Sequence, residues 1–206
     1  MKWHDIQEEI NNCHELKPAL AMITKPVRPP EPQKGDILFM SEAPPPDGGF
    51  WEEKTNDALR RNIGSIVTPE LANANLMLQK FRDQRLTLVQ TLKWPFLETS
   101  IAEIRHSALR HIFQEISFIN PREIIALGKV AGRALQVLYP KSDFATKFRQ
   151  LKTIDTLRRG EYNADGLAIR ITYLPVDRMW NQYADEIRPD ILRFIGDARK
   201  VNNQMN

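Results

Sequence analysis

The chain has 206 residues, of which 42% are hydrophobic, and this suits one globular domain with a sizeable core. Its one cysteine, Cys13, excludes an intramolecular disulfide and a metal cluster held by four cysteines. No apolar run approaches the ~18 residues of a membrane span, and the charged N-terminus lacks the apolar core of a signal peptide, so we expect a cytoplasmic protein without a membrane partner. The net charge of +3 is a weak indication of a polyanionic partner.

Residues 1–34 are expected to form a helix and a connector at the start of a single domain that spans residues 1–206. Apolar residues at three- and four-residue spacing predict an amphipathic helix within residues 1–17, and they are Trp3, Ile6, Ile10, Cys13 and Leu16. Residues 24–34 are polar and rich in proline, so we interpret them as an extended connector into the first strand.

The most informative stretch is DILFMSEAPPPDGGFW, residues 36–51. Its apolar start predicts a strand over residues 36–41 that is buried on both faces of a parallel sheet. A polar loop follows, and it carries Ser41, Glu42, three prolines, Asp47, two glycines, Phe50 and Trp51. Ligands of open α/β sheets bind beyond the carboxyl ends of the strands, so this loop is a candidate site. The alternative is a surface loop stiffened by proline, with its aromatic pair tucked inward.

Three further strands are expected over residues 85–93, 123–127 and 167–174, which are apolar or alternating and rich in β-forming residues. Helices are expected over residues 56–63, 70–82 (with Thr68 as N-cap), 100–119 (opened by the capping box Ser100–Glu103), 128–139 and 183–201. Strands that alternate with helices indicate βαβ units. The expected fold is therefore a three-layer α/β/α arrangement around a four-stranded parallel sheet in the order 2-1-3-4.

Three stretches, taken in order, resemble the uracil-DNA glycosylase superfamily. ILFMSEAPPPDGGFWE is similar to the first motif of that superfamily, which reads Gly-Glu-Ala-Pro-Gly in the iron–sulfur branch, with Ser41 in place of the first glycine. ISFINPREIIALGKVAGRAL resembles the segment in which a helix, Asn-Pro-Arg, a strand, Leu-Gly and a second helix follow one another. LVQTLKWP and ITYLPVDR stand where the family carries its pyrimidine-reading strand and its His-Pro-Ser loop. The resemblance spans residues 36–197, which is most of the chain.

The chain also departs from the family pattern. Because Cys13 stands alone where the iron–sulfur branch has four cysteines, we expect no metal cluster, no other metal and no cofactor. Leu174 precedes Pro175 where the family has a histidine, and Ala43 occupies the position of the water-activating aspartate of the most-studied branch. Two positions expected to perform chemistry are therefore apolar, and we expect uracil excision to be weak or absent.

The resemblance implies roles for side chains at the strand ends. Glu42 and Asp47 are the carboxylates that can stabilise a sugar cation or orient water. Phe50 or Trp51 would stack an extruded base, and Gln90 would read its edge. Lys129, Arg133 and Arg178 would contact phosphates, and Met179 or Trp180 would wedge into the base stack.

Each of these side chains also has an ordinary structural interpretation. Glu42 can bond loop amides, Asp47 can form an Asx turn, and Gln90 can face outward from its strand. Lysines and arginines on helix surfaces are usually only solvated. The four histidines are interpreted as structural or surface residues, because none lies at a predicted strand end. His106 and His111 lie five residues apart on one helix and so do not share a metal-binding face.

Three functions remain open. The first is a DNA-binding protein that accommodates a single-stranded or flipped base and excises uracil or another deaminated base as a DNA N-glycosylase. The second is a protein on the same fold that binds nucleic acid without cutting it. The third is a small-molecule enzyme on a doubly wound sheet, and the sequence contains neither Gly-x-Gly-x-x-Gly nor Gly-x-x-x-x-Gly-Lys to support a nucleotide-dependent version.

Overall fold

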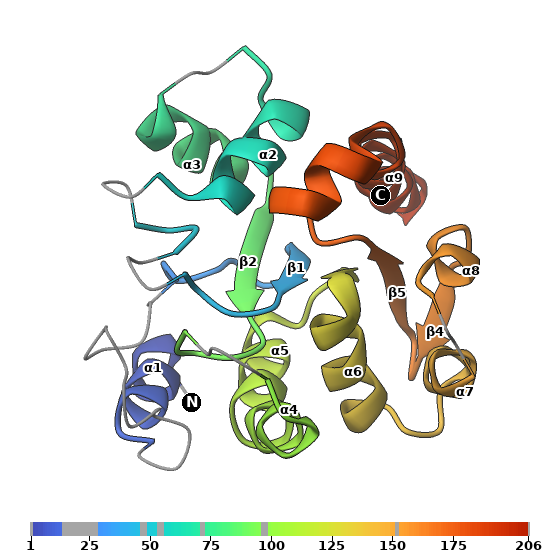
Figure 1. Ribbon diagram of the computed structural model, residues 1–206. Coiled ribbons are helices and arrows are strands. Elements are labelled where there is room, and N and C mark those ends of the chain that lie inside the picture. The colour runs from blue at the N-terminus through green and yellow to red at the C-terminus, as the bar shows by residue number, and fades with distance from the viewer. Residues whose placement is uncertain are drawn as a thin grey trace.

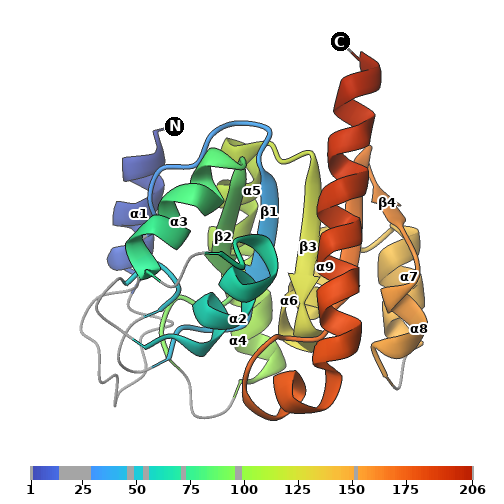
Figure 2. The same ribbon diagram turned by 90° about the horizontal axis from the view of Figure 1, so that it is seen from above.

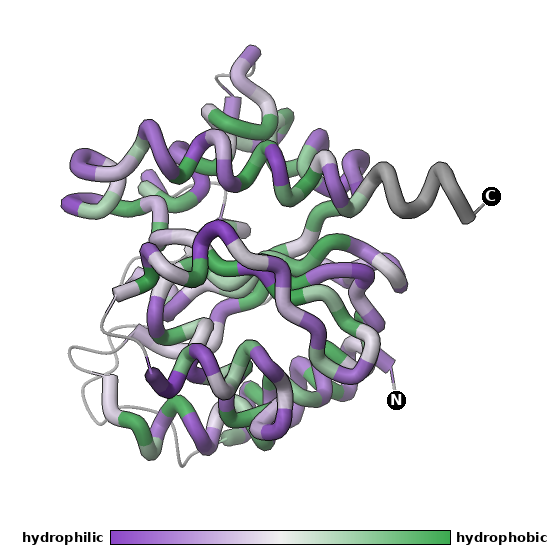
Figure 3. The backbone as a smooth tube through the Cα atoms, turned by 90° about the vertical axis from the view of Figure 1, so that its right-hand side faces the viewer, coloured by the Kyte–Doolittle hydropathy of each residue, from purple (hydrophilic) through white to green (hydrophobic). Residues whose placement is uncertain are grey.

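The computed structural model describes residues 2–13, 29–45, 49–52, 56–70, 73–95, 99–150 and 153–205. Within these residues a mixed sheet lies between two layers of helices (Figures 1 and 3). The strands are β1 (Ile37–Ser41), β2 (Leu86–Gln90), β3 (Glu123–Leu127), β4 (Tyr162–Ala164) and β5 (Leu167–Thr172). The helices are α1 (Trp3–Asn11), α2 (Ala58–Val67), α3 (Ala74–Asp83), α4 (Ile101–Ser107), the π-helical turn η1 (Ala108–Ile112), α5 (Phe113–Ile119), α6 (Gly128–Leu138), α7 (Asp143–Arg149), α8 (Asp155–Arg158) and α9 (Asp177–Met205). Among the described helices, none combines the length and the apolar character that crossing a bilayer requires.

The strand order across the described sheet is β2-β1-β3-β5-β4. The predicted strands correspond to β1, β2, β3 and β5, which pair in parallel, and the predicted pairing of β1 with β3 is confirmed. The prediction of a four-stranded, wholly parallel sheet is wrong, because β4 pairs antiparallel with β5 and adds an edge. Asp165 and Gly166 join these two strands with φ of 53° and 87°, the pair of positive values that a type I′ hairpin turn needs.

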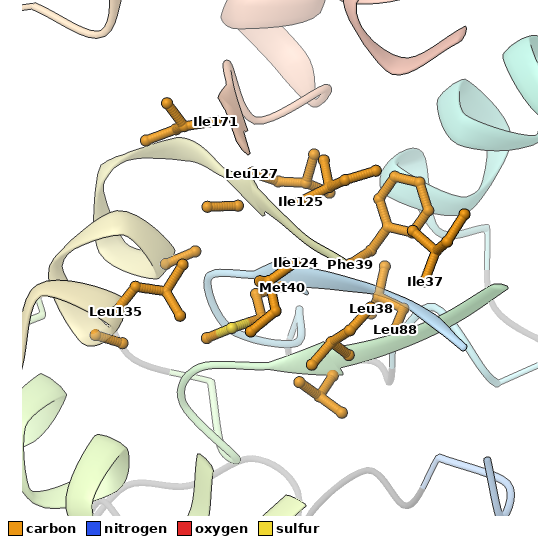
Figure 4. Close-up of a cluster of buried hydrophobic side chains, with 14 of the residues drawn as sticks. Ile37, Leu38, Phe39, Met40, Leu88, Ile124, Ile125, Leu127, Leu135 and Ile171 are labelled. Atoms are coloured by element: carbon orange, nitrogen blue, oxygen red, sulfur yellow. The ribbon is translucent and has the colours of Figure 1, made fainter. Parts of the chain in front are cut away.

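The central strand β1 is buried along its whole length, so its side chains form the core on both faces of the sheet (Figure 4). The ring of Phe39 packs 5.7 Å from the ring of Phe81 on α3. Met40 points to the opposite face, toward Leu135 of α6, as the two-residue period of a strand requires. Figure 1 shows α2, α3 and α9 over the first face and α1, α4, α5 and α6 over the second.

Several helix boundaries differ from those expected. Thr68 ends α2, and it is the Asn73 side chain that caps α3, by accepting from the backbone N–H groups of Asn75 and Leu76. The capping box at Ser100 and Glu103 is confirmed. The basic and weakly patterned stretch of residues 141–160, for which no helix was expected, contains α7 and α8. The last helix begins at Asp177 rather than at residue 183, bends at Tyr183, and carries Pro189 inside it.

A buried arginine joins the amino ends of the sheet to α9. The Nε atom of Arg170 on β5 lies 3.0 Å from Oε1 of Glu123 on β3, which is within ion-pair distance. The same guanidinium lies 2.5 Å from Glu161 and 3.3 Å from Asp197. Three carboxylates thus share one cation. Burial raises the pKa of Glu123 to about 7, and Glu161 and Asp197 add to the effect, while Arg170 opposes it.

This raised pKa predicts that the protein loses stability as the pH rises from about 4.5 to 7. Folded Glu123 holds its proton to about pH 7, whereas the unfolded side chain releases it near 4.5. The favourable contribution is therefore complete below the lower value and lost above the upper one, and it is at most about 3 kcal/mol. Urea unfolding of the protein and of its Glu123→Gln variant from pH 4 to 8 measures it. Equal slopes in the two proteins would contradict the assignment.

Candidate functional site

The carboxyl ends of the parallel strands meet at one edge of the sheet, and this edge is the candidate site. Figure 2 shows this edge with α2 and the first turns of α9 beside it. The last residues of β1 and β2, Ser41 and Gln90, are register partners and are both buried. Partners in a parallel pair point to the same face, so the hydroxyl and the amide lie side by side. Among the described residues, the Ser41 hydroxyl has no hydrogen-bond partner, which is unusual for a buried polar group.

Glu42 follows Ser41 on a corner that backbone hydrogen bonds hold in place. The N–H groups of Thr91 and Leu92 donate to the carbonyls of Ser41 and Glu42, each at 2.9 Å. The Thr91 hydroxyl also donates to the Ser41 carbonyl, at 2.7 Å. Burial raises the pKa of the half-buried Glu42 carboxyl. A carboxyl group of this kind exchanges protons closer to neutrality than an exposed one.

The remaining predicted residues of the loop separate into three cases. Asp47 lies outside the described residues, so its catalytic role stays a prediction. Phe50 is fully buried, with its ring 5.1 Å from that of Phe81, and an interpretation as a base-stacking residue does not fit this burial. Trp51 is half-buried and its indole N–H donates to the Leu88 carbonyl at 2.9 Å.

The exposed part of Trp51 faces a groove beside α3. This groove has a volume of about 670 Å³ and is lined by Pro30, Gln33, Trp51, Asn75, Leu78, Gln79, Arg82 and Asp83. Trp51 itself bonds to Leu88 of β2, which is an edge strand of the described sheet. Trp51 therefore lies away from Lys129 and Arg178, which follow the carboxyl ends of β3 and β5.

Two predicted basic residues share a second groove, at the start of α6. This groove has a volume of about 230 Å³ and is lined by Ile104, Lys129, Val130, Arg133, Phe148, Thr153 and Ile154. The helix begins directly at the carboxyl end of β3, where Gly128 has φ of 88°. The guanidinium of Arg133 lies over the Phe148 ring, 5.4 Å from its centroid. The groove thus combines two cations with the amino end of an 11-residue helix, an arrangement that suits a phosphate.

The loop after β5 lies against the start of α6 and against α2. A Cβ added to Gly128 would lie 3.1 Å from the Cβ of Leu174, and the amide of Asn62 on α2 donates to the Pro175 carbonyl at 2.8 Å. In the first turn of α9, Arg178 is exposed, whereas Met179 is half-buried against the core. Arg178 is therefore available for a phosphate, while Met179 presents only part of its side chain.

Sequence reasoning missed a network that holds the end of β5. The Tyr173 hydroxyl donates to the Asp155 carboxylate, and the Tyr173 ring stacks on Tyr183 with centroids 4.2 Å apart. Nε of Arg158 lies 2.7 Å from Oδ2 of Asp190, which also accepts from Thr172. Burial, and then the bond to Asp155, raise the pKa of the Tyr173 hydroxyl. The tyrosine therefore stays protonated, and we assign it to positioning the loop.

The expectation that His106 and His111 face apart is wrong. His106 lies in the last turn of α4 and His111 lies within the π-helical turn η1, in which the N–H of Phe113 donates to the Ala108 carbonyl five residues back. The i→i+5 bond widens this turn beyond the 3.6 residues of an α-helix, so side chains five apart lie closer to one face. Their ring centroids are 6.3 Å apart. Cys13 lies beside them, with Sγ 4.0 Å from Nε2 of His106.

No family model and no curated protein matches this chain. The likeness to the glycosylase superfamily therefore rests on the motifs at the strand ends. The function is accordingly argued from the chemistry of the residues at this edge.

Proposed function

We propose that the protein binds a nucleic-acid strand along the carboxyl edge of its sheet and receives one unstacked base beside Ser41, Glu42 and Gln90. The observation that carries the proposal is the pairing of Ser41 with Gln90 at the ends of neighbouring strands, with the serine hydroxyl buried and unpartnered within the described residues. A buried hydroxyl without a protein partner favours a ligand or water at that point. The order of the three family-like stretches supports the same conclusion.

The three side chains suit the edge of a nucleobase. An amide offers a donor and an acceptor side by side, and a hydroxyl offers either. The edge of a base also presents donors and acceptors, so the polar groups of the protein and of the base can form hydrogen bonds with one another. Glu42 can accept as a carboxylate or donate as a carboxylic acid, because its burial raises its pKa.

The cations at this edge indicate the path that a bound nucleic-acid strand would take. Lys129 and Arg133 border the groove at the start of α6, and Arg178 is exposed at the start of α9. The helix amino end adds backbone N–H groups with a positive partial charge. Phosphates of the nucleic acid can therefore lie along the starts of α6 and α9, while one base lies at the carboxyl edge of the sheet.

We expect binding of a short DNA single strand to weaken with salt. Three phosphate contacts on a single strand give a slope near −2 in log affinity against log salt, or about 20-fold between 50 and 200 mM. Fluorescence anisotropy with a labelled thymidine 12-mer measures this slope. Lys129→Ala and Arg178→Ala should each reduce it by roughly 0.7.

The matched control is Lys80→Ala. Lys80 is an exposed lysine in the last turn of α3, which leads into the amino end of β2. This variant should leave both affinity and slope unchanged. An affinity for DNA that does not depend on salt, or an equal loss in all three variants, would contradict the proposal. Absence of any binding would favour a small-molecule enzyme on this sheet.

A further inference from the structure

The strongest unexplained feature outside the candidate site is the group formed by Cys13, His106 and His111. One potential metal-ligating atom from each residue lies within 4.8 Å of the others. Cys13 and His111 are buried, with exposed fractions of 5% and 1%. Among the described residues neither ring nitrogen of His111 has a hydrogen-bond partner. A buried imidazole with two unpartnered nitrogens beside a thiol requires an explanation.

We propose that Cys13, His106 and His111 bind one zinc ion. Zinc takes thiolate and imidazole ligands in tetrahedral geometry, and this donor set matches its preference. An iron–sulfur cluster with four thiolates does not fit, because the chain has one cysteine.

The distances support a single ion. Three atoms that lie within 4.8 Å of one another all lie within about 2.8 Å of a common point, and zinc bonds to nitrogen and sulfur are about 2.0–2.3 Å long. Closing the site therefore needs side-chain movements of about half an ångström to an ångström. Three protein ligands leave the fourth tetrahedral position to a water molecule or another donor.

The backbone arrangement explains how the three residues meet. The π-helical turn between α4 and α5 directs His106 and His111 to one side, and such turns occur often at functional sites. The thiol comes from the end of α1, which packs beside α5. Side-chain hydrogen bonds from Gln114 to Glu9 at 2.9 Å and from Gln7 to Glu115 at 3.4 Å help to hold α1 there.

The surrounding charges leave the site able to accept a cation. The groups whose positive charge acts on His111 are Lys93, His106 and Arg110, and His106 is itself a proposed ligand. Lys93 is neutralised by Glu115, with Nζ 2.6 Å from Oε2, and Arg110 lies 3.6 Å from Glu9. A Cys13 thiolate adds the negative charge that stabilises a divalent ion.

Cobalt(II) titration of the full-length protein tests the proposal. The protein is purified without a histidine tag, stripped with a chelator and titrated anaerobically, because cobalt replaces zinc and is coloured. We expect one cobalt per chain, with thiolate-to-cobalt charge-transfer absorption and the intense visible bands of tetrahedral coordination. Excess zinc should displace these bands. At about 100-fold excess over its dissociation constant, zinc should raise the Tm by roughly 5–10 °C.

Cys13→Ser and His106→Gln test the ligands, and His4→Ala is the matched control because His4 is exposed on α1. Cys13→Ser should lose the charge-transfer band. Each ligand variant should weaken binding by more than the roughly 10–100-fold that loss of an outer-shell partner costs. His4→Ala should bind like the unaltered protein. Failure of the unaltered protein to bind cobalt stoichiometrically would overturn the proposal, as would a folded Cys13→Ser variant that retains the band.

Discussion

Replacing Lys93 with methionine should lower the free energy of unfolding by about 3–5 kcal/mol, because Glu115 is left as an unpaired charge in the interior. Lys93 follows β2, and its Nζ donates to Glu115 at 2.6 Å and to the Gln90 carbonyl at 2.6 Å. Exposed fractions are 4% for Lys93 and 0% for Glu115. Burial lowers the pKa of the Lys93 ammonium, and Glu115 opposes this. Each charge of the pair therefore offsets the cost of burying the other.

Urea unfolding and calorimetry measure this effect, which corresponds to a fall in Tm of roughly 6–20 °C. The double variant Lys93→Met/Glu115→Leu should recover most of the loss, because two apolar side chains leave no buried charge. The control is Arg110→Met, which breaks the exposed pair with Glu9 and should cost less than about 1 kcal/mol. A cost for Lys93→Met as small as that of Arg110→Met would refute the assignment.

The parallel strands could be predicted because they are buried on both faces. Residues 37–40 and 124–127 are unbroken apolar runs, and such runs occur where helices cover both sides of a sheet. β4 was missed because three residues give too short a pattern to recognise. The signal that could have found it is Asp165-Gly166, the dipeptide of a two-residue hairpin turn, which stands directly before the last parallel strand.

The π-helical turn could not be predicted from spacing. The buried residues of this helix are Ile104, Ser107, Ala108, His111, Ile112, Glu115, Ile116 and Ile119, which follow the three- and four-residue spacing of an ordinary α-helix. The burial pattern is therefore that of a continuous α-helix, and it gives no sign of the i→i+5 bond. The meeting of His106 with His111 therefore became visible only in three dimensions.

The candidate site was predictable where topology alone determines it. Residues that follow the ends of neighbouring parallel strands must lie at one edge, and this places Ser41 beside Gln90. It does not determine which way a loop side chain turns. The pair Phe50-Trp51 turns inward because Phe81 offers apolar surface there, with ring centroids 5.1 and 5.9 Å away.

We expect uracil excision by the unaltered protein to be weak or undetectable. A leaving uracil anion needs a hydrogen-bond donor, and the loop after β5 presents Leu174, Pro175 and Val176, which have no polar side-chain atom. Loss of one well-placed oxyanion donor costs roughly 3–4 kcal/mol, or about 100- to 1,000-fold in rate. Incubation with single- and double-stranded oligonucleotides that carry uracil, hypoxanthine or xanthine, followed by alkaline cleavage, measures excision. Efficient turnover of uracil would contradict this expectation.

Leu174→His should then raise the excision rate by up to about 100-fold, because it supplies the missing donor. Leu174 lies two strand spacings, about 10 Å, from the end of β1 that carries Glu42. A flipped nucleotide can span this distance, so an imidazole at residue 174 can reach the leaving base while Glu42 stays beside it. Leu174→Phe is the matched control, since its ring has no donor. Adding Glu42→Gln to the histidine variant should abolish the gain. A folded Leu174→His protein that binds DNA and gains no activity would favour the non-catalytic alternative. The edge would then bind a base without holding a carboxylate and a donor where cleavage requires them.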